Sequence, residues 1–260
     1  MILRIIIVIV MLYKFVENYK LHKISKQDRI IKNLFTLSNN QKITKVNNGF
    51  YIIDNFYKDP DMIRQFAISN KNNFLDHTAI YLTRSLNPFL YSDLGYQIID
   101  KFESIIWQDI NRKDWDVDVE LNSNGFIQYI TKDMKPAIHH DDHWGGIVFL
   151  SPNAKRNTGT SIFKHKKTGI TKFLTNNEIV KKYGKNKVKE YLGSYKSDLW
   201  NGNEEAKFDK WEKIYQCENV YNRAIIFDGR QWHCSDGGFG DKIENARLFQ
   251  TFFFSPFKKN

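Results

Sequence analysis

The spacing of hydrophobic positions changes along the chain near residue 125. Before this point, apolar residues recur at helical spacing in two segments, and we predict helices after Asp59-Pro60-Asp61 and over 94–110. A run of β-forming residues predicts a strand at 49–56. After residue 125, short apolar runs alternate with turn residues, as expected for successive strands. We predict these strands at 126–130, 137–141, 147–150, 160–163, 223–227 and 246–254.

A charged, lysine-rich segment at 174–215 interrupts the predicted strands. Its pattern favours helices around 178–192 and 204–215, so we predict a helical insertion between two strands. Helices followed by many short strands favour an α+β fold with supporting N-terminal helices. Seven or eight short strands fit a β-sandwich or jelly roll.

The N-terminal region is expected to lie outside the compact domain. Residues 1–16 are largely apolar but too few to span a bilayer, which needs roughly 20 residues. An anchor, a signal peptide and a buried first element all fit this segment; we favour an anchor that associates the protein with a membrane. The polar and basic residues 17–47 predict a linker, and a single domain is expected over 48–257.

Charge and cysteine content narrow the function classes. The net charge is +10, yet residues 1–50 hold nine Lys/Arg and two Asp/Glu and so contribute +7 of it. Because this excess lies outside the predicted domain, nucleic acid is not an expected partner. Cys217 and Cys234 match neither a disulfide framework nor a zinc pattern, so we expect free thiols in a reducing compartment such as the cytoplasm.

Residues 138–143 read Ile-His-His-Asp-Asp-His and form the strongest chemical signal. Residues i and i+2 of a strand share a face, so His139 can point with Asp141, or His140 with Asp142. Because a slip of one residue exchanges the two faces, the spacing leaves both registers open. Two histidines and one carboxylate around a metal are typical of non-haem Fe(II) oxygenases.

The third ligand and an anion-binding group follow later in the chain. His233 is the best candidate ligand, because it comes soon after the strand that ends in Phe227-Asp228-Gly229 and lies in a predicted turn. Arg247 follows at the start of the last strand. Its planar guanidinium can grip a carboxylate with two parallel hydrogen bonds.

This ordered set resembles the iron- and 2-oxoglutarate-dependent dioxygenase superfamily, most nearly its prolyl-4-hydroxylase-like branch. The resemblance spans about residues 120–256 and rests on Gln128-Tyr129, 138–141, Gly159-Thr160, 227–229, His233 and Arg247. It implies a double-stranded β-helix that holds Fe(II) through His139, Asp141 and His233. It further implies that Arg247 binds the distal carboxylate of 2-oxoglutarate and that Tyr129 helps to hold this cosubstrate.

One position departs from the family pattern. Many members carry a small hydroxyl residue two positions after the arginine, where this chain has Phe249. Thr251 shares the strand face of Arg247, and we expect it to replace that residue in cosubstrate binding.

The resemblance implies an oxidoreductase that uses O2 to hydroxylate a protein side chain or a small molecule. Two alternatives are a non-oxidative, cupin-like metal-binding protein and a nucleic-acid demethylase of the same superfamily. A cupin-like protein needs no anchor such as Arg247, and repair-type demethylases usually carry a second arginine that is missing after Arg247. The pattern does not identify the substrate.

Overall fold

The computed structural model describes residues 33–77, 83–86, 96–110, 124–196 and 207–256. These residues contain α-helices and antiparallel sheets, which confirms the predicted α+β class. The strands are β1 (Lys42–Asn47), β2 (Phe50–Asp54), β3 (Leu75–His77), β4 (Thr83–Leu86), β5 (Ile127–Ile130), β6 (Trp144–Phe149), β7 (Thr160–His165), β8 (Trp211–Cys217), β9 (Ala224–Asp228), β10 (His233–Ser235) and β11 (Arg247–Phe254). The α-helices are α2 (Pro60–Ser69), α3 (Tyr96–Ile106), α4 (Asn176–Tyr183) and α5 (Val188–Lys196).

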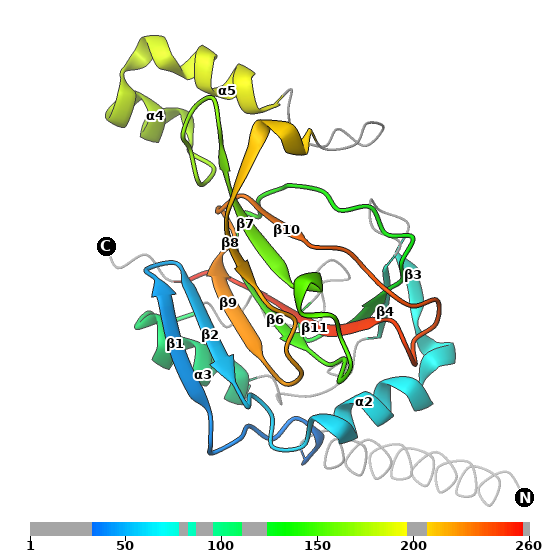
Figure 1. The fold of residues 1–260 in the computed structure, drawn as a ribbon. Helices are drawn as coiled ribbons and strands as arrows, with labels where there is room; N and C mark the ends of the chain where they lie inside the picture. Colours follow the sequence, from blue (N-terminus) through cyan, green and yellow to red (C-terminus); the bar gives the residue numbers. More distant parts are fainter. Residues whose placement is uncertain (1–32, 78–82, 87–95, 111–123, 197–206, 257–260) are drawn as a thin grey trace, which may run out of the picture.

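The strands form two sheets (Figure 1). The large sheet has the order β1-β2-β9-β6-β11-β5-β4-β3, and the small sheet has the order β10-β7-β8. From β5 onward the chain passes back and forth between the sheets: β5 and β6 are in the large sheet, β7 and β8 in the small one, β9 in the large, β10 in the small and β11 in the large. This path brings residues that are distant in sequence to the space between the sheets.

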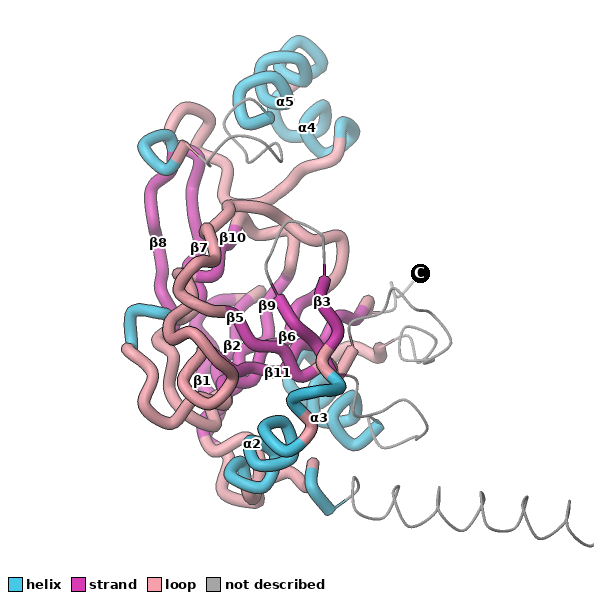
Figure 2. The backbone as a smooth tube through the Cα atoms, turned by 90° about the vertical axis from the view of Figure 1, so that its right-hand side faces the viewer, coloured by secondary structure: helices cyan, strands magenta, loops and turns pink. Residues whose placement is uncertain are grey.

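Helices α2 and α3 cover the outer face of the large sheet (Figure 2). Asp59 caps α2 as predicted, since its Oδ1 accepts a hydrogen bond from the Met62 backbone N–H at 3.1 Å. On α3, Phe102 is fully buried and its ring stacks on that of Phe254 at 5.3 Å between centroids. The helices bury one face of the sheet and leave its other face to the small sheet.

The opposite face of the large sheet packs against the small sheet. Phe149 and Phe227 of the large sheet form one buried cluster with Ile162 and Cys217 of the small sheet. Such interdigitating inner faces are typical of two-layer β structures. The cavity described below lies next to this cluster and shares Phe227 with it.

Three predicted elements differ from the structure. The strand predicted at 137–141 is reduced to a single bridge between His139 and His233, because the chain bends away at Asp142 and His143. The helix predicted at 204–215 is wrong where it overlaps β8, because pairing with β7 overrides a charged local sequence. The helix predicted at 178–192 is divided into α4 and α5 at Gly184, which has a positive φ of 91°.

The predicted linker also overlaps the fold, because β1 pairs with β2 at the edge of the large sheet. The side chains of β1 are almost all exposed, so its sequence lacks the alternation that marks a half-buried strand.

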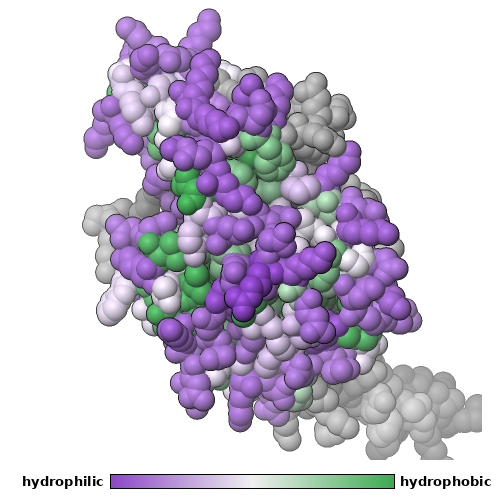
Figure 3. All heavy atoms as spheres, in the orientation of Figure 1, coloured by the Kyte–Doolittle hydropathy of each residue, from purple (hydrophilic) through white to green (hydrophobic). Residues whose placement is uncertain are grey.

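Residues 1–16 lie outside the described residues. Within the described ranges, no helix is long and apolar enough to cross a membrane. Hydrophilic side chains dominate the face of the molecule in Figure 3.

Candidate metal centre

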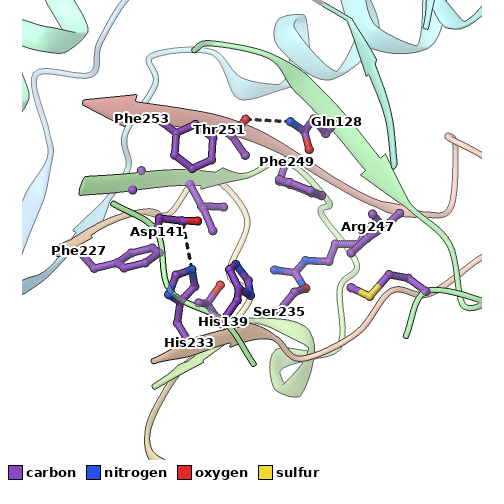
Figure 4. A pocket seen from close by; sticks show the side chains of 16 residues that line it. Gln128, His139, Asp141, Phe227, His233, Ser235, Arg247, Phe249, Thr251 and Phe253 are labelled. Atoms are coloured by element: carbon purple, nitrogen blue, oxygen red, sulfur yellow. Dashed lines mark hydrogen bonds and ion pairs between the residues drawn. The ribbon is translucent and has the colours of Figure 1, made fainter. Parts of the chain in front are cut away.

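His139, Asp141 and His233 converge between the two sheets (Figure 4). One ligand atom from each residue lies within 4.8 Å of the other two. The His233 Nε2 atom is 3.3 Å from Asp141 Oδ2. No other group of three such side chains was found in the part of the chain that the structure describes. The two-histidine, one-carboxylate set predicted from sequence is therefore brought together.

Backbone hydrogen bonds fix all three candidate ligands in place. The His139 N–H donates to the His233 carbonyl at 3.0 Å, and the His233 N–H donates to the His139 carbonyl at 2.9 Å. The Asp141 N–H donates to the Gly229 carbonyl at 2.8 Å. His233 begins strand β10 rather than lying in the predicted turn. Because the pairing runs through the main chain, it does not depend on a bound ion.

Both imidazoles are oriented by backbone carbonyls. The Nδ1 atom of His139 lies 2.9 Å from the Ala137 carbonyl, and that of His233 lies 2.8 Å from the Gln231 carbonyl. A carbonyl can only accept, so each Nδ1 carries a proton, and in the neutral ring Nε2 is then the nitrogen with a lone pair for a metal. Such a carbonyl partner is the usual way in which a protein aims a metal-binding histidine.

The protonation states also suit a metal. Burial, reinforced by the neighbouring His233, lowers the pKa of His139 to about 4, so this imidazole is neutral at neutral pH. Burial alone would raise the pKa of Asp141, but the hydrogen bond and charge of His233 outweigh it and hold this pKa below its usual value. A neutral imidazole and an ionised carboxylate are the forms that bind metals.

The alternative pair, His140 and Asp142, does not join this cluster. The His140 ring stacks on Phe173 with 4.2 Å between centroids and an angle of 14° between planes. It also meets the edge of Trp232. Asp142 is exposed and does not join the cluster. His139 and Asp141 thus line the cavity, whereas His140 between them faces Phe173 and Trp232.

A cavity of about 290 Å³ lies beside the three candidate ligands. Alternate residues of β11 face it, namely Arg247, Phe249, Thr251 and Phe253 (Figure 4). The ligands stand opposite these residues, so one cavity contains both the metal site and the arginine. Its wall on β6 consists of Gly145, Gly146 and Ile147. The two glycines have no side chain and so leave space in the cavity.

Arg247 is 1% exposed and lines the cavity, and it forms no ion pair with a carboxylate of the described residues. Its Nη1 donates to the Ser235 hydroxyl and to the Gly237 carbonyl, the latter at 3.1 Å. Its buried Nε finds no hydrogen-bond partner among the residues that the structure describes. Burial lowers its pKa to about 10, against the opposing charge of Asp236, so the group stays charged at neutral pH. A buried, unpaired cation with a free donor favours an anionic ligand.

Thr251 and Tyr129, both predicted to bind the cosubstrate, are placed differently. Thr251 lines the cavity, where its hydroxyl accepts a hydrogen bond from Gln128 Nε2 at 3.0 Å. Tyr129 lies on the other face of β5, packs on the outer core and meets the Phe74 ring at 5.4 Å. Tyr129 therefore does not line the cavity, in contrast to the predicted placement. Its register partner on β11 is Leu248, a core residue, so the neighbouring Gln128 faces the cavity instead.

Thr160, Ser235 and Gln128 line the cavity but were not among the predicted site residues. The Thr160 hydroxyl is buried and has no hydrogen-bond partner within the described ranges. Alternation along β5 would have selected Gln128 once the face of one neighbour was known. No spacing in the sequence singles out Ser235, because its contact with Arg247 joins two separate strands.

Comparisons with known proteins give one sequence family and several solved structures. A family of unknown function (DUF6445) matches residues 134–254. No curated protein matches the chain. HygX from Streptomyces hygroscopicus, with nickel, 2-oxoglutarate and hygromycin B bound, is similar with 12% identity and a TM-score of 0.44, over 80% of this chain and 83% of that one.

Two prolyl hydroxylases also match. The Trichoplax adhaerens enzyme, in complex with a hypoxia inducible factor peptide fragment, has 11% identity and a TM-score of 0.43, over 92% of this chain and 93% of that one. A Pseudomonas putida prolyl-4-hydroxylase has 8% identity and a TM-score of 0.37, over 81% and 94%.

Proposed function

We propose that this protein is an Fe(II)- and 2-oxoglutarate-dependent oxygenase that hydroxylates a protein side chain or a small molecule. The observation that carries the proposal is one cavity holding both the triad of His139, Asp141 and His233 and the buried, unpaired Arg247. A double-stranded β-helix is the proposed framework. The path of the chain between the two sheets supports it.

The donor set fits Fe(II). Two imidazole nitrogens and one carboxylate form the facial triad that leaves positions open for other ligands. The carbonyls of Ala137 and Gln231 hold the two rings so that Nε2 is available. Both His139 and Asp141 have pKa values that favour their metal-binding forms. His139 and Asp141 would therefore bind the ion without a change of protonation at neutral pH.

The far end of the cavity fits the distal carboxylate of 2-oxoglutarate. Arg247 offers its unpartnered Nε, and Thr160 offers an unpartnered buried hydroxyl. Thr251 is a further candidate contact on the same strand face as Arg247. When bound, Fe(II) and 2-oxoglutarate supply oxidative decarboxylation coupled to oxidation of a C–H bond. The aromatic walls at Phe227 and Phe249 would exclude water from the reacting groups.

The cavity walls also restrict the part of the substrate that reacts. Apart from the triad and Arg247, the residues that line the cavity are uncharged, and most are apolar. Gln128 and Thr251 provide one neutral hydrogen-bonding pair. We expect the reacting group to be uncharged, because a charged group would lose its hydration without gaining a partner.

Anaerobic titration of the full chain with Fe(II) and then 2-oxoglutarate tests the proposal. Chelation of the metal by the keto acid is expected to produce a visible metal-to-ligand charge-transfer absorption band, and a matched titration with succinate should not. Metal binding without this band would favour a non-oxidative, cupin-like protein. Absence of metal binding would overturn the proposal.

A further inference from the structure

One short turn, Asp228–Gln231, holds two of the three candidate metal ligands. The Gly229 carbonyl accepts the backbone N–H of Asp141 at 2.8 Å. The Gln231 carbonyl lies 2.8 Å from Nδ1 of His233 and accepts its proton. A displacement of this turn would therefore reorient both ligands.

The turn is packed tightly against the ligand segment at Gly229. A Cβ atom at this position would lie 2.9 Å from Asp141 Cβ and would collide with the His143 carbonyl oxygen. Such a close approach leaves no room for the turn to move toward the ligands. The position of the turn then depends on the contacts that it makes on the side away from the ligands.

Arg230 holds the turn from the side of the helical insertion. Its Nη1 is 3.2 Å from Oε1 of Glu178, a residue of α4. Its Nε and its backbone N–H both reach Asp228 Oδ1, at 3.4 and 3.1 Å. Arg230 thus joins the insertion to the first residue of the turn.

Glu178 is itself fixed at the start of α4. Its Oε2 accepts hydrogen bonds from the backbone N–H and the hydroxyl of Thr175, at 2.8 and 2.9 Å. These bonds form a capping box, in which Thr175 also caps the helix. The other carboxylate oxygen is presented to Arg230, so the ion pair links a capped helix end to the turn.

The segment that enters the insertion pairs with the same turn. The Phe173 N–H donates to the Arg230 carbonyl at 2.7 Å, and the Trp232 N–H donates to the Thr171 carbonyl at 3.0 Å. The Phe173 ring stacks on His140, the neighbour of a candidate ligand. Backbone and side-chain contacts therefore connect the insertion to the metal-binding segment.

We propose that Arg230 is a positioning residue, which couples the α4 end of the insertion to the turn that orients Asp141 and His233. The inference rests on the proposed function, because it requires a metal at that site. Arg230 does not line the cavity, so it acts through the turn rather than by touching a ligand. The side chains of Arg230 and Glu178 are 35% and 41% exposed, and pairs with this exposure add little to global stability.

Titration of the full chain with Co(II), a spectroscopic substitute for Fe(II), tests this role. Arg230→Ala is expected to weaken Co(II) binding about tenfold, the lower end of the effect of partners that orient ligands. The Co(II) absorption spectrum at saturation is expected to change as well, because the ligand geometry changes. The control is Arg156→Ala, which removes an exposed Arg–Glu pair with Glu218, 3.0 Å long, away from the turn.

Glu178→Gln is the second variant, because it weakens the ion pair but keeps the side-chain length at the helix cap. Glu178→Gln should reproduce part of the loss of Co(II) affinity. If Arg230→Ala does not fold, the Co(II) affinity of Glu178→Gln tests the inference instead. Unchanged affinity and spectrum in the folded variants would overturn the inference while leaving the metal site intact. Equally weakened Co(II) binding in Arg156→Ala would also overturn the inference, since loss of one positive charge anywhere on the surface would then explain the effect. Failure of the unaltered protein to bind Co(II) would overturn the proposed function itself.

Discussion

His139 and His233 are joined by two reciprocal backbone hydrogen bonds, and their rings lie 4.2 Å apart between centroids. One residue lies in an irregular segment and the other begins β10, which pairs with β7. Their pairing therefore exists only when the small sheet is folded. A metal that binds these residues should stabilise the folded protein over the unfolded chain.

Replacement of single histidines is expected to distinguish the two registers. His139→Ala should abolish specific Fe(II) or Co(II) binding, because it removes one of three converging donors. His140→Ala is the matched control and should keep the metal site, since His140 stacks on Phe173 instead. Calorimetric titration of both variants measures the difference. Loss of binding in His140→Ala alone would contradict the assignment.

Arg247 is expected to control cosubstrate affinity more than metal affinity. Arg247→Met should weaken 2-oxoglutarate binding roughly ten- to a hundredfold, because a hydrogen bond to a charged group contributes about 1.5–3 kcal/mol. Titration of 2-oxoglutarate into the metal-loaded protein under anaerobic conditions measures this loss. Co(II) affinity in the absence of 2-oxoglutarate is the control. An unchanged 2-oxoglutarate affinity would show that the carboxylate binds elsewhere.

Gly229→Ala is expected to destabilise the fold and the metal site together. The added methyl group would meet Asp141 Cβ at 2.9 Å and the His143 carbonyl, and such overpacking costs about 1–3 kcal/mol. Gly193→Ala is the control, because Gly193 lies in α5 with no heavy atom within 4 Å of the added group. That change should stabilise the helix by about 0.5–1 kcal/mol. Urea unfolding measures whether each variant lowers or raises the free energy of unfolding.

The two cysteines are expected to be inert in the native protein. Both are buried free thiols, and burial raises the pKa of Cys217 and of Cys234 to about 12. The reactive thiolate is then rare at pH 8, and reaction with Ellman's reagent should be roughly a thousandfold slower than for an exposed thiol. The same protein in denaturant supplies the reference rate. Fast labelling without denaturant would contradict the burial of both thiols.

The metal-free protein should lose stability on mild acidification through His139. Its folded-state pKa of about 4 lies below the ordinary value of 6.5, so between these pH values the unfolded state binds more protons. This contribution is fully present above pH 6.5 and is lost as the pH falls toward 4. His139→Gln should show a smaller decrease in unfolding free energy over that window. An equal decrease in both proteins would assign the effect to other groups.

Short local patterns were enough to predict several elements. Asp59 and Pro60 mark the start of α2 because capping depends on neighbouring residues only. The predicted helix at 94–110 contains α3, whose apolar residues recur at helical spacing. Strand β8 was missed because its exposed, charged residues resemble a helix surface until β7 pairs with it. The predicted linker hid edge strand β1, because its side chains are almost all exposed and show no alternation.

The sequence by itself determined the chemical inventory: a His-x-Asp pair, a later histidine and an arginine at the start of the last strand. It could not choose between His139 and His140, nor between Gln128 and Tyr129, because each choice depends on which face a strand presents. The tertiary structure decided both, through the bridge to His233 and the pairing of Tyr129 with core-facing Leu248. The residue types are local properties of a chain, whereas strand register is fixed by partners distant in sequence.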